Sequence, residues 1–310
     1  MRKMTFTETF KIEATAPFDF DLTAHIFSFG DRQIRVYAND QFSQVLNING
    51  KLFLVKLTST GTVGQPNITV EVNSNSPITT QDTRQAEAAV KFIFNLDFPL
   101  CSFYNEIKND PKMTKIAQQL YGLKNPTTST VFEALVDSIV EQQISIKVAH
   151  TIEERLIKKF GGKLVLDGEP YYAYPTPQNI ASSSIDEIQG CGLTQRKAQY
   201  IHGAAQLIAD GNLNLENLKT HQNPEEIIKE LDAIRGIGVW TAELTMLRGM
   251  QRLDALPADD LGVRRVTSRY YCGGKPIKSD EAREIAKSWG KWKGLAAFYL
   301  IIAESKDIKV

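Results

Sequence analysis

The spacing of apolar residues changes near residue 100 and divides the chain into two unlike parts. Before this point, segments rich in β-branched and aromatic residues alternate with turn formers, at 33–38, 42–48, 51–60 and 67–74. Beyond it, apolar residues recur at helical spacing almost to the C-terminus. The pattern predicts an α+β fold, in which an N-terminal antiparallel β-sheet domain is followed by an all-α domain.

The position of this change predicts two domains, 1–100 and 101–310. A chain of 310 residues is long enough for two or three packed units. The segment 83–94 has helical spacing and is expected to complete the N-terminal unit. The segment 165–177 interrupts the helical pattern, and we interpret it as a loop packed by its tyrosines.

Composition excludes several classes of protein. The three cysteines, Cys101, Cys191 and Cys272, form no CxxC pair, which argues against an iron–sulfur cluster or structural zinc and fits a reducing cytosol. The start of the sequence has no apolar signal-peptide region, and no run is long enough to span a membrane. The net charge of +0 argues mildly against a strong electrostatic DNA binder.

The most informative segment is a helix–turn–helix pattern over 225–249, with Gly236-Ile237-Gly238 at its turn. Two glycines so close together permit positive φ and close backbone approach. The helix that begins near Val239 would then present unpaired N–H groups as an anion site, for which a nucleic-acid phosphate is the obvious ligand. Such binding needs little net charge. The plainer alternative is an ordinary corner between two helices.

Further informative segments lie before and after this hairpin in the sequence. They are Phe132-Glu133-Ala134-Leu135, Glu141-Gln142-Gln143-Ile144-Ser145, Gly192-Leu193-Thr194-Gln195-Arg196-Lys197-Ala198 and Leu256-Pro257-Ala258-Asp259-Asp260-Leu261-Gly262. Together they resemble the helix-hairpin-helix DNA glycosylases, over about 132–269. The bacterial inducible 3-methyladenine glycosylase branch is the most similar. Arg235 departs from the family pattern, which usually has proline there.

The resemblance implies a two-lobed helical domain, with lobes of about 131–259 and of 101–130 plus 260–310. The cleft between the lobes is expected to hold the hairpin and the catalytic carboxylate. The N-terminal part is similar, more loosely, to the α+β domain that precedes this core in the 3-methyladenine and 8-oxoguanine branches. The segment 17–22 carries that likeness.

In the family pattern the catalytic aspartate directly precedes a leucine, which assigns Asp260 rather than Asp259. Cleavage of an N-glycosidic bond builds positive charge on the sugar, and a fixed carboxylate stabilises that charge and can activate water. A base alkylated on a ring nitrogen is already cationic and leaves without a general acid. The alternative role for either aspartate is to cap the following helix.

The family's bifunctional members carry a nucleophilic lysine just after the hairpin, where this sequence has Trp240. The resemblance therefore implies a monofunctional enzyme, with Trp240 and Leu244 in the base pocket. The indole face could stack on a flipped cationic base. Core packing is the alternative for Trp240. Other aromatic candidates for the pocket are Trp289, Trp292, Phe298 and Tyr299.

The DNA contacts implied by the family comprise the hairpin backbone at Gly236, Ile237 and Gly238, a wedge residue and one cation. Gln143 matches the wedge that fills the hole left by a flipped base, although it could be an ordinary polar residue at a helix end. Lys197 is the cation expected on a phosphate. No cofactor is expected, apart from a monovalent cation held by the main-chain carbonyls of Asp232, Ile234 and Ile237.

The sequence thus predicts a monomeric, monofunctional DNA glycosylase that excises 3-methyladenine- and 7-methylguanine-type bases from damaged double-stranded DNA. Its expected location is the cytoplasm, with the nucleoid DNA, or the nucleus in a eukaryote. One alternative is an oxidised-base glycosylase of the 8-oxoguanine type. The other is a non-catalytic protein that binds damaged DNA through the hairpin.

Overall fold

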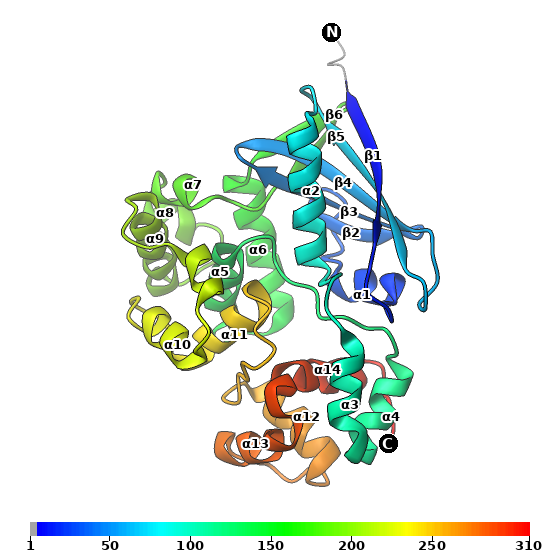
Figure 1. The fold of residues 1–310 in the computed structure, drawn as a ribbon. Coiled ribbons are helices and arrows are strands. Elements are labelled where there is room, and N and C mark those ends of the chain that lie inside the picture. Colours follow the sequence, from blue (N-terminus) through cyan, green and yellow to red (C-terminus); the bar gives the residue numbers. More distant parts are fainter. Residues whose placement is uncertain (1–4) are drawn as a thin grey trace.

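The computed structural model describes residues 5–310, and its N-terminal part is built on a five-stranded antiparallel sheet (Figure 1). The strands run in the order β1-β5-β4-β3-β2. Their bounds are β1 Phe6–Glu13, β2 Arg35–Ala38, β3 Gln41–Ile48, β4 Lys51–Ser59 and β5 Asn67–Ser74. The four predicted strand segments are therefore confirmed, and β1 is an addition at the sheet edge.

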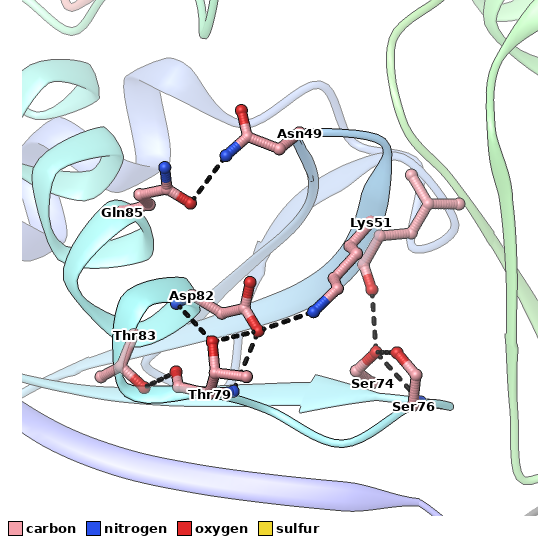
Figure 2. Close-up of polar contacts among 9 residues, drawn as sticks. Asn49, Lys51, Ser74, Ser76, Thr79, Asp82, Thr83 and Gln85 are labelled. Atoms are coloured by element: carbon pink, nitrogen blue, oxygen red, sulfur yellow. Dashed lines mark hydrogen bonds and ion pairs between the residues drawn. The ribbon is translucent and has the colours of Figure 1, made fainter.

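Two helices, α1 (Phe20–Phe27) and α2 (Thr80–Ile93), pack on one face of this sheet. The predicted helix at 83–94 is α2, which begins earlier because a capping box forms at its N-terminus. Asp82 Oδ2 accepts from the Thr79 backbone N–H at 2.9 Å and from Lys51 Nζ at 3.0 Å (Figure 2). The Thr79 hydroxyl accepts from the Asp82 N–H in return, at 3.1 Å.

The segment 165–177 was expected to be a loop, and this prediction is wrong. Strands β6 (Lys163–Leu166) and β7 (Glu169–Tyr172) form an antiparallel hairpin there. Its turn residues, Asp167 and Gly168, both have positive φ, as a tight two-residue hairpin turn requires. Buried Leu164 and Leu166 pack with Val45 and Leu54 on the face of the sheet opposite α2. The hairpin thereby attaches the sheet to the helical part.

The remaining chain is helical, as predicted, and forms two hydrophobic cores. The first core gathers α5 Val131–Glu141, α6 Ile146–Phe160, α7 Pro177–Ala181, α8 Ile185–Gln189, α9 Gln195–Ala209, the 3-10 helix Leu215–Thr220, α10 Pro224–Asp232 and α11 Val239–Gly249. The second gathers α3 Leu100–Glu106, the 3-10 helix Ile107–Asn109, α4 Pro111–Gln119, α12 Leu261–Tyr271, α13 Ser279–Ala286, the 3-10 helix Lys287–Trp292 and α14 Lys293–Ser305.

The chain passes through the second core twice. Helices α3 and α4 lie beside α12 and α14, although the two pairs come from distant parts of the sequence (Figure 1). Helix α11 contacts both cores, because Met246 packs into the first and Leu247 into the second. The link from α11 to α12 therefore crosses between the helices of the first core and those of the second, which are called the first and second lobes below. No helix within residues 5–310 is long and apolar enough to span a bilayer.

Candidate active site

A cleft of about 1250 Å³ opens where the sheet unit and the two helical lobes meet. The N-terminal unit contributes the end of α1 and the following loop, at 26–29. The first lobe contributes the turn between α5 and α6 and the lining face of α11, and the second contributes the start of α12 and part of α14. Segments from all three parts of the chain therefore enclose one site.

The predicted hairpin lies between α10 and α11, and its first glycine is required by packing. Gly236 has φ of 89°, and a Cβ there would lie 2.2 Å from the ring of Tyr200. Gly238 is the exposed N-cap residue of α11 and provides no side-chain cap. The first N–H groups of this helix thus face outward, which is the geometry of an anion site.

The side chains of Ile234 and Ile237 are buried in the first lobe and anchor the turn. Their backbones are joined as well, because the Ile237 N–H donates to the Ile234 carbonyl at 3.0 Å. A main-chain carbonyl has a second lone pair, so this bond leaves Ile234 able to accept a further partner. The cation expected at Asp232, Ile234 and Ile237 stays a prediction.

Asp260 caps α12 and faces the cleft at the same time. Its Oδ1 accepts from the Val263 backbone N–H at 3.0 Å, and its Oδ2 accepts from Trp240 Nε1 at 3.2 Å. Gly262 leaves room for this carboxylate, because a Cβ there would lie 2.9 Å from Oδ1. The two roles that the sequence left as alternatives are therefore compatible. Asp259 is more exposed, and its one ion pair within residues 5–310 is with Arg283, at 3.9 Å.

Trp240 and Leu244 lie one turn apart on α11, and both line the cleft. The bond from Trp240 to Asp260 places the indole beside the carboxylate and not in a hydrophobic core. Of the four C-terminal aromatic candidates for the pocket, three lie away from the cleft and one lines it. Trp289 and Tyr299 are fully buried in the second lobe, and Trp292 packs edge-on against Phe98. Phe298 lines the cleft, together with Ile301 and Ile302.

The predicted wedge, Gln143, is exposed in the turn between α5 and α6 and has φ of 57°. A left-handed backbone is uncommon for a residue other than glycine, so this turn depends on its surroundings. Gln142 ties it to the hairpin, since its Nε2 donates to the Gly236 carbonyl at 3.2 Å and to Thr241 Oγ1 at 3.0 Å. The turn that carries the predicted wedge is thus connected to the hairpin.

Lys197 was expected to bind a DNA phosphate, and this role stays a prediction. Its Nζ donates to the carbonyls of Val140, at 2.8 Å, and Gln142, at 2.6 Å. A cation at the C-terminal carbonyls of α5 satisfies acceptors that the helix leaves open. Burial lowers the pKa of this ammonium. Lys197 therefore supports the turn between α5 and α6, which carries Gln143.

A buried polar cluster that was not predicted from the sequence lies partly in the cleft and partly in a small cavity beside it, next to the sheet unit. It comprises Arg35, Glu133, Asp137, Glu141, Glu153, Tyr174 and Arg248. Burial, reinforced by neighbouring carboxylates, raises the pKa of Asp137 to about 7 and that of Glu153 to about 9. The four-residue spacing of Glu133, Asp137 and Glu141 on one face of α5 was the available signal.

Residues 136–291 match the model of the HhH-GPD superfamily of base excision DNA repair proteins. The chain belongs to this superfamily. Among its relatives, a DNA-3-methyladenine glycosylase of Bacillus subtilis is 33% identical over 233 residues, which are 74% of this chain and 75% of the relative. The sequence-based assignment to the helix-hairpin-helix glycosylases is confirmed.

Solved structures of two DNA glycosylases match nearly the whole chain. A 3-methyladenine DNA glycosylase from Archaeoglobus fulgidus has a TM-score of 0.84 and 26% identity, covering 96% of this chain and 98% of that one. An 8-oxoguanine glycosylase/lyase of Clostridium acetobutylicum in complex with double-stranded DNA has a TM-score of 0.75 and 21% identity, covering 98% and 99%. The second likeness is one of fold, and it extends through the N-terminal sheet.

Proposed function

We propose that this chain is a monofunctional DNA N-glycosylase that removes alkylated purines from double-stranded DNA. The observation that carries the proposal is the Asp260 carboxylate, which faces the cleft with each oxygen held by an N–H group. A carboxylate fixed before the reaction stabilises developing positive charge without reorganising, and such stabilisation accounts for much of the rate enhancement of many enzymes.

The reaction follows from this placement. As the N-glycosidic bond breaks, positive charge grows on the sugar and the bonding electron pair leaves with the base. Asp260 stabilises the cationic sugar and orients or deprotonates the water that attacks it. A base alkylated on a ring nitrogen carries its own positive charge, so it departs as a neutral molecule with no proton donor.

Trp240 occupies the place where bifunctional relatives have a lysine, and no lysine is found among the described residues that line the cleft. An indole cannot form a Schiff base, so strand cleavage by that route has no nucleophile here. Its face can stack on the flipped base, and this contact is strongest when the base is cationic. Both points favour excision of alkylated bases without strand cleavage.

DNA is held by surfaces around the cleft. The outward N–H groups at the start of α11 bind a backbone phosphate, and Gln143 enters the space that the flipped base vacates. Gln142 joins these two elements, so phosphate binding and base flipping occur in a fixed relative position. One chain supplies the hairpin, the wedge and the carboxylate, and a monomer therefore suffices.

Names of relatives support the substrate class. The Bacillus subtilis and Archaeoglobus fulgidus proteins are named as 3-methyladenine glycosylases, and the solved structures include a superfamily fold bound to double-stranded DNA. The oxidised-base alternative has a likeness of fold in its favour, at 21% identity. The lesion preference of the purified protein distinguishes an alkylated-base glycosylase from an oxidised-base glycosylase.

The test uses duplex oligonucleotides that each carry one lesion: 7-methylguanine, hypoxanthine, 1,N6-ethenoadenine, uracil or 8-oxoguanine. Each product is resolved with and without hot alkali. Breaks that appear only after alkali, on the alkylated purines 7-methylguanine or 1,N6-ethenoadenine, support the proposal. Nicking without alkali that is strongest on 8-oxoguanine would contradict it. A protein that binds abasic DNA and excises nothing would be a non-catalytic binder.

A further inference from the structure

One face of α11 leads from the catalytic carboxylate into the polar cluster. Trp240, Leu244 and Arg248 follow one another at four-residue spacing, and all three line the cleft. Long side chains on a helix point back toward its N-terminus, so the guanidinium of Arg248 extends toward Leu244. A base that enters past Trp240 and Leu244 therefore meets a charged group beyond them.

Arg248 is paired in a way that leaves hydrogen-bonding atoms unused. Its Nη1 donates to Glu141 Oε1 at 2.6 Å, and no other hydrogen bond of this side chain exists within residues 5–310. The side chains keep exposed fractions of 34% for Arg248 and 12% for Glu141. The Nε and Nη2 donors of Arg248 and the Oε2 acceptor of Glu141 can therefore bind a ligand.

A neighbouring carboxyl group points to the same conclusion. Glu153 has an exposed fraction of 5%, and its Oε1 has no hydrogen-bond partner in the described part of the chain. Buried polar atoms without partners are rare in folded proteins and call for an explanation. Because Glu153 lines the cleft together with Glu141 and Arg248, a polar ligand in this part of the cleft would supply that explanation.

We propose that Arg248 and Glu141 form a subsite that reads the hydrogen-bonding edge of a flipped 6-oxopurine. Such a base, hypoxanthine or 7-methylguanine, carries the O6 carbonyl beside the N1–H group. The guanidinium donates to O6, and the Glu141 carboxylate accepts from N1–H. The inference rests on the proposed glycosylase function, adds the deaminated purine hypoxanthine to its substrates, and predicts a preference for 6-oxopurines among them.

The chemistry of the pair favours this class of purine. The two residues offer a donor next to an acceptor, which complements a carbonyl next to an N–H group. An alkylated adenine carries an amino donor at C6 and an acceptor at N1, the opposite order to a 6-oxopurine, so Arg248 and Glu141 would each face a group of the wrong kind. 1,N6-ethenoadenine has its edge closed by an extra ring and offers no N–H there, so it serves as the reference substrate.

The electrostatics of the cluster keep the pair charged. Burial alone would lower the pKa of Arg248, but Glu141, with Asp137 and Glu153 nearby, raises it above its ordinary value. The guanidinium of Arg248 thus remains a cation within the cleft. Its charge is balanced by Glu141, so a cationic base can approach without net repulsion.

The experiment compares single-turnover excision by the full-length wild type with that by Arg248→Met, Arg248→Lys and Glu141→Gln. The substrates are duplexes carrying hypoxanthine, 7-methylguanine or 1,N6-ethenoadenine. Arg84→Met, which removes an exposed arginine on α2 outside the cleft, is the matched control. The melting temperature and affinity for abasic-site DNA, which leaves the base pocket empty, are measured for each protein.

We expect Arg248→Met to lose about 10- to 100-fold on both 6-oxopurines and less than about threefold on ethenoadenine. Glu141→Gln should lower the same two rates, Arg248→Lys should keep part of them, and Arg84→Met should change none. Equal losses of excision rate on all three lesions would show that the pair has a structural role and would overturn the inference. Unchanged rates on the 6-oxopurines would overturn it too. If Arg248→Met does not fold, the rates of Arg248→Lys and Glu141→Gln test the inference in its place. A wild type that excises none of the lesions would instead overturn the proposed function itself.

Discussion

The indole N–H of Trp240 donates to Oδ2 of Asp260 across a distance of 3.2 Å. This bond joins the helix that follows the hairpin to the carboxylate at the start of α12. The other carboxylate oxygen is held by the Val263 backbone, so the orientation of the group is fixed from two sides. Trp240, for which the family resemblance implies the lysine position of bifunctional members, thus helps to hold Asp260, the proposed catalytic aspartate.

Trp240→Phe keeps an aromatic face in the cleft and removes the N–H donor. We expect the single-turnover excision rate to fall about 10-fold, because a carboxylate that loses a charge-assisted hydrogen bond is less well oriented. Trp240→Leu, which also removes the stacking surface, should cost more. Equal rates for Trp240→Phe and wild type would show that the bond does not position Asp260.

Gly236→Ala should damage both stability and DNA binding. The added Cβ would meet the Tyr200 ring at 2.2 Å, at a residue whose φ is 89°. We expect a loss of about 2 kcal/mol or more in the free energy of unfolding, measured by urea denaturation, and weaker binding to abasic-site duplexes.

Gly203→Ala is the control for that substitution, because Gly203 lies within α9 and its Cβ would meet no atom within 4 Å. Alanine is a better helix former than glycine, so this variant should gain up to about 1 kcal/mol. If the two variants had the same stability, the fit of Gly236 against Tyr200 would not constrain the hairpin.

Lys197→Met removes the ammonium that holds the carbonyls of Val140 and Gln142. We expect excision from duplex DNA to fall about 5- to 20-fold, since the wedge turn loses two charge-assisted hydrogen bonds. Excision from single-stranded DNA, which needs no wedge, should change less. Arg196→Met removes the exposed neighbouring charge and should leave the ratio of the two rates unchanged. A parallel loss on both substrates would point to a general structural role.

The buried cluster should make stability depend on pH. The pKa of Glu153 rises from its ordinary value of 4.5 to about 9 in the native protein, chiefly through burial. Between these values the native state binds a proton that the unfolded chain has released, so stability falls as pH rises through this range. Glu153→Gln needs no proton and escapes that loss.

We therefore expect the melting temperature of Glu153→Gln, relative to that of the wild type, to rise as the pH increases from 5 to 9. The melting temperature of the variant minus that of the wild type should be at least about 3 °C higher at pH 9 than at pH 5. Glu187→Gln is a suitable comparison, because Glu187 is an exposed capping residue whose pKa is lowered by its Ser184 bonds. A difference for Glu153→Gln that is constant across this pH range would contradict the account.

Local sequence signals predicted much of the fold. Strands with β-branched residues and helices with apolar periodicity formed where those patterns occur, because local propensity and burial agree there. The hairpin of β6 and β7 was missed, since its two strands have only four residues each and Asp167-Gly168 was not interpreted as a hairpin turn. Helix α1 was missed as well, because it has just eight residues.

The site shows where sequence patterns reach their limit. The positions of Asp260 and Trp240 in a known motif predicted that both belong to the cleft. Their mutual hydrogen bond depends on how α11 and α12 cross, and no spacing rule provides that. Lys197 illustrates the same limit. Its sequence context suggested a phosphate contact and gave no sign of the two bonds that its side chain donates to carbonyls at the end of α5.

The most direct test of the account is excision by Asp260→Asn under single-turnover conditions on a 7-methylguanine or hypoxanthine duplex. Asparagine caps a helix as well as aspartate does, so the fold and the affinity for abasic-site DNA should be retained. We predict a loss of at least about 100-fold in the excision rate, while Asp259→Asn loses less than about threefold. Full activity of Asp260→Asn, or a larger loss for Asp259→Asn, would show that the catalytic carboxylate lies elsewhere.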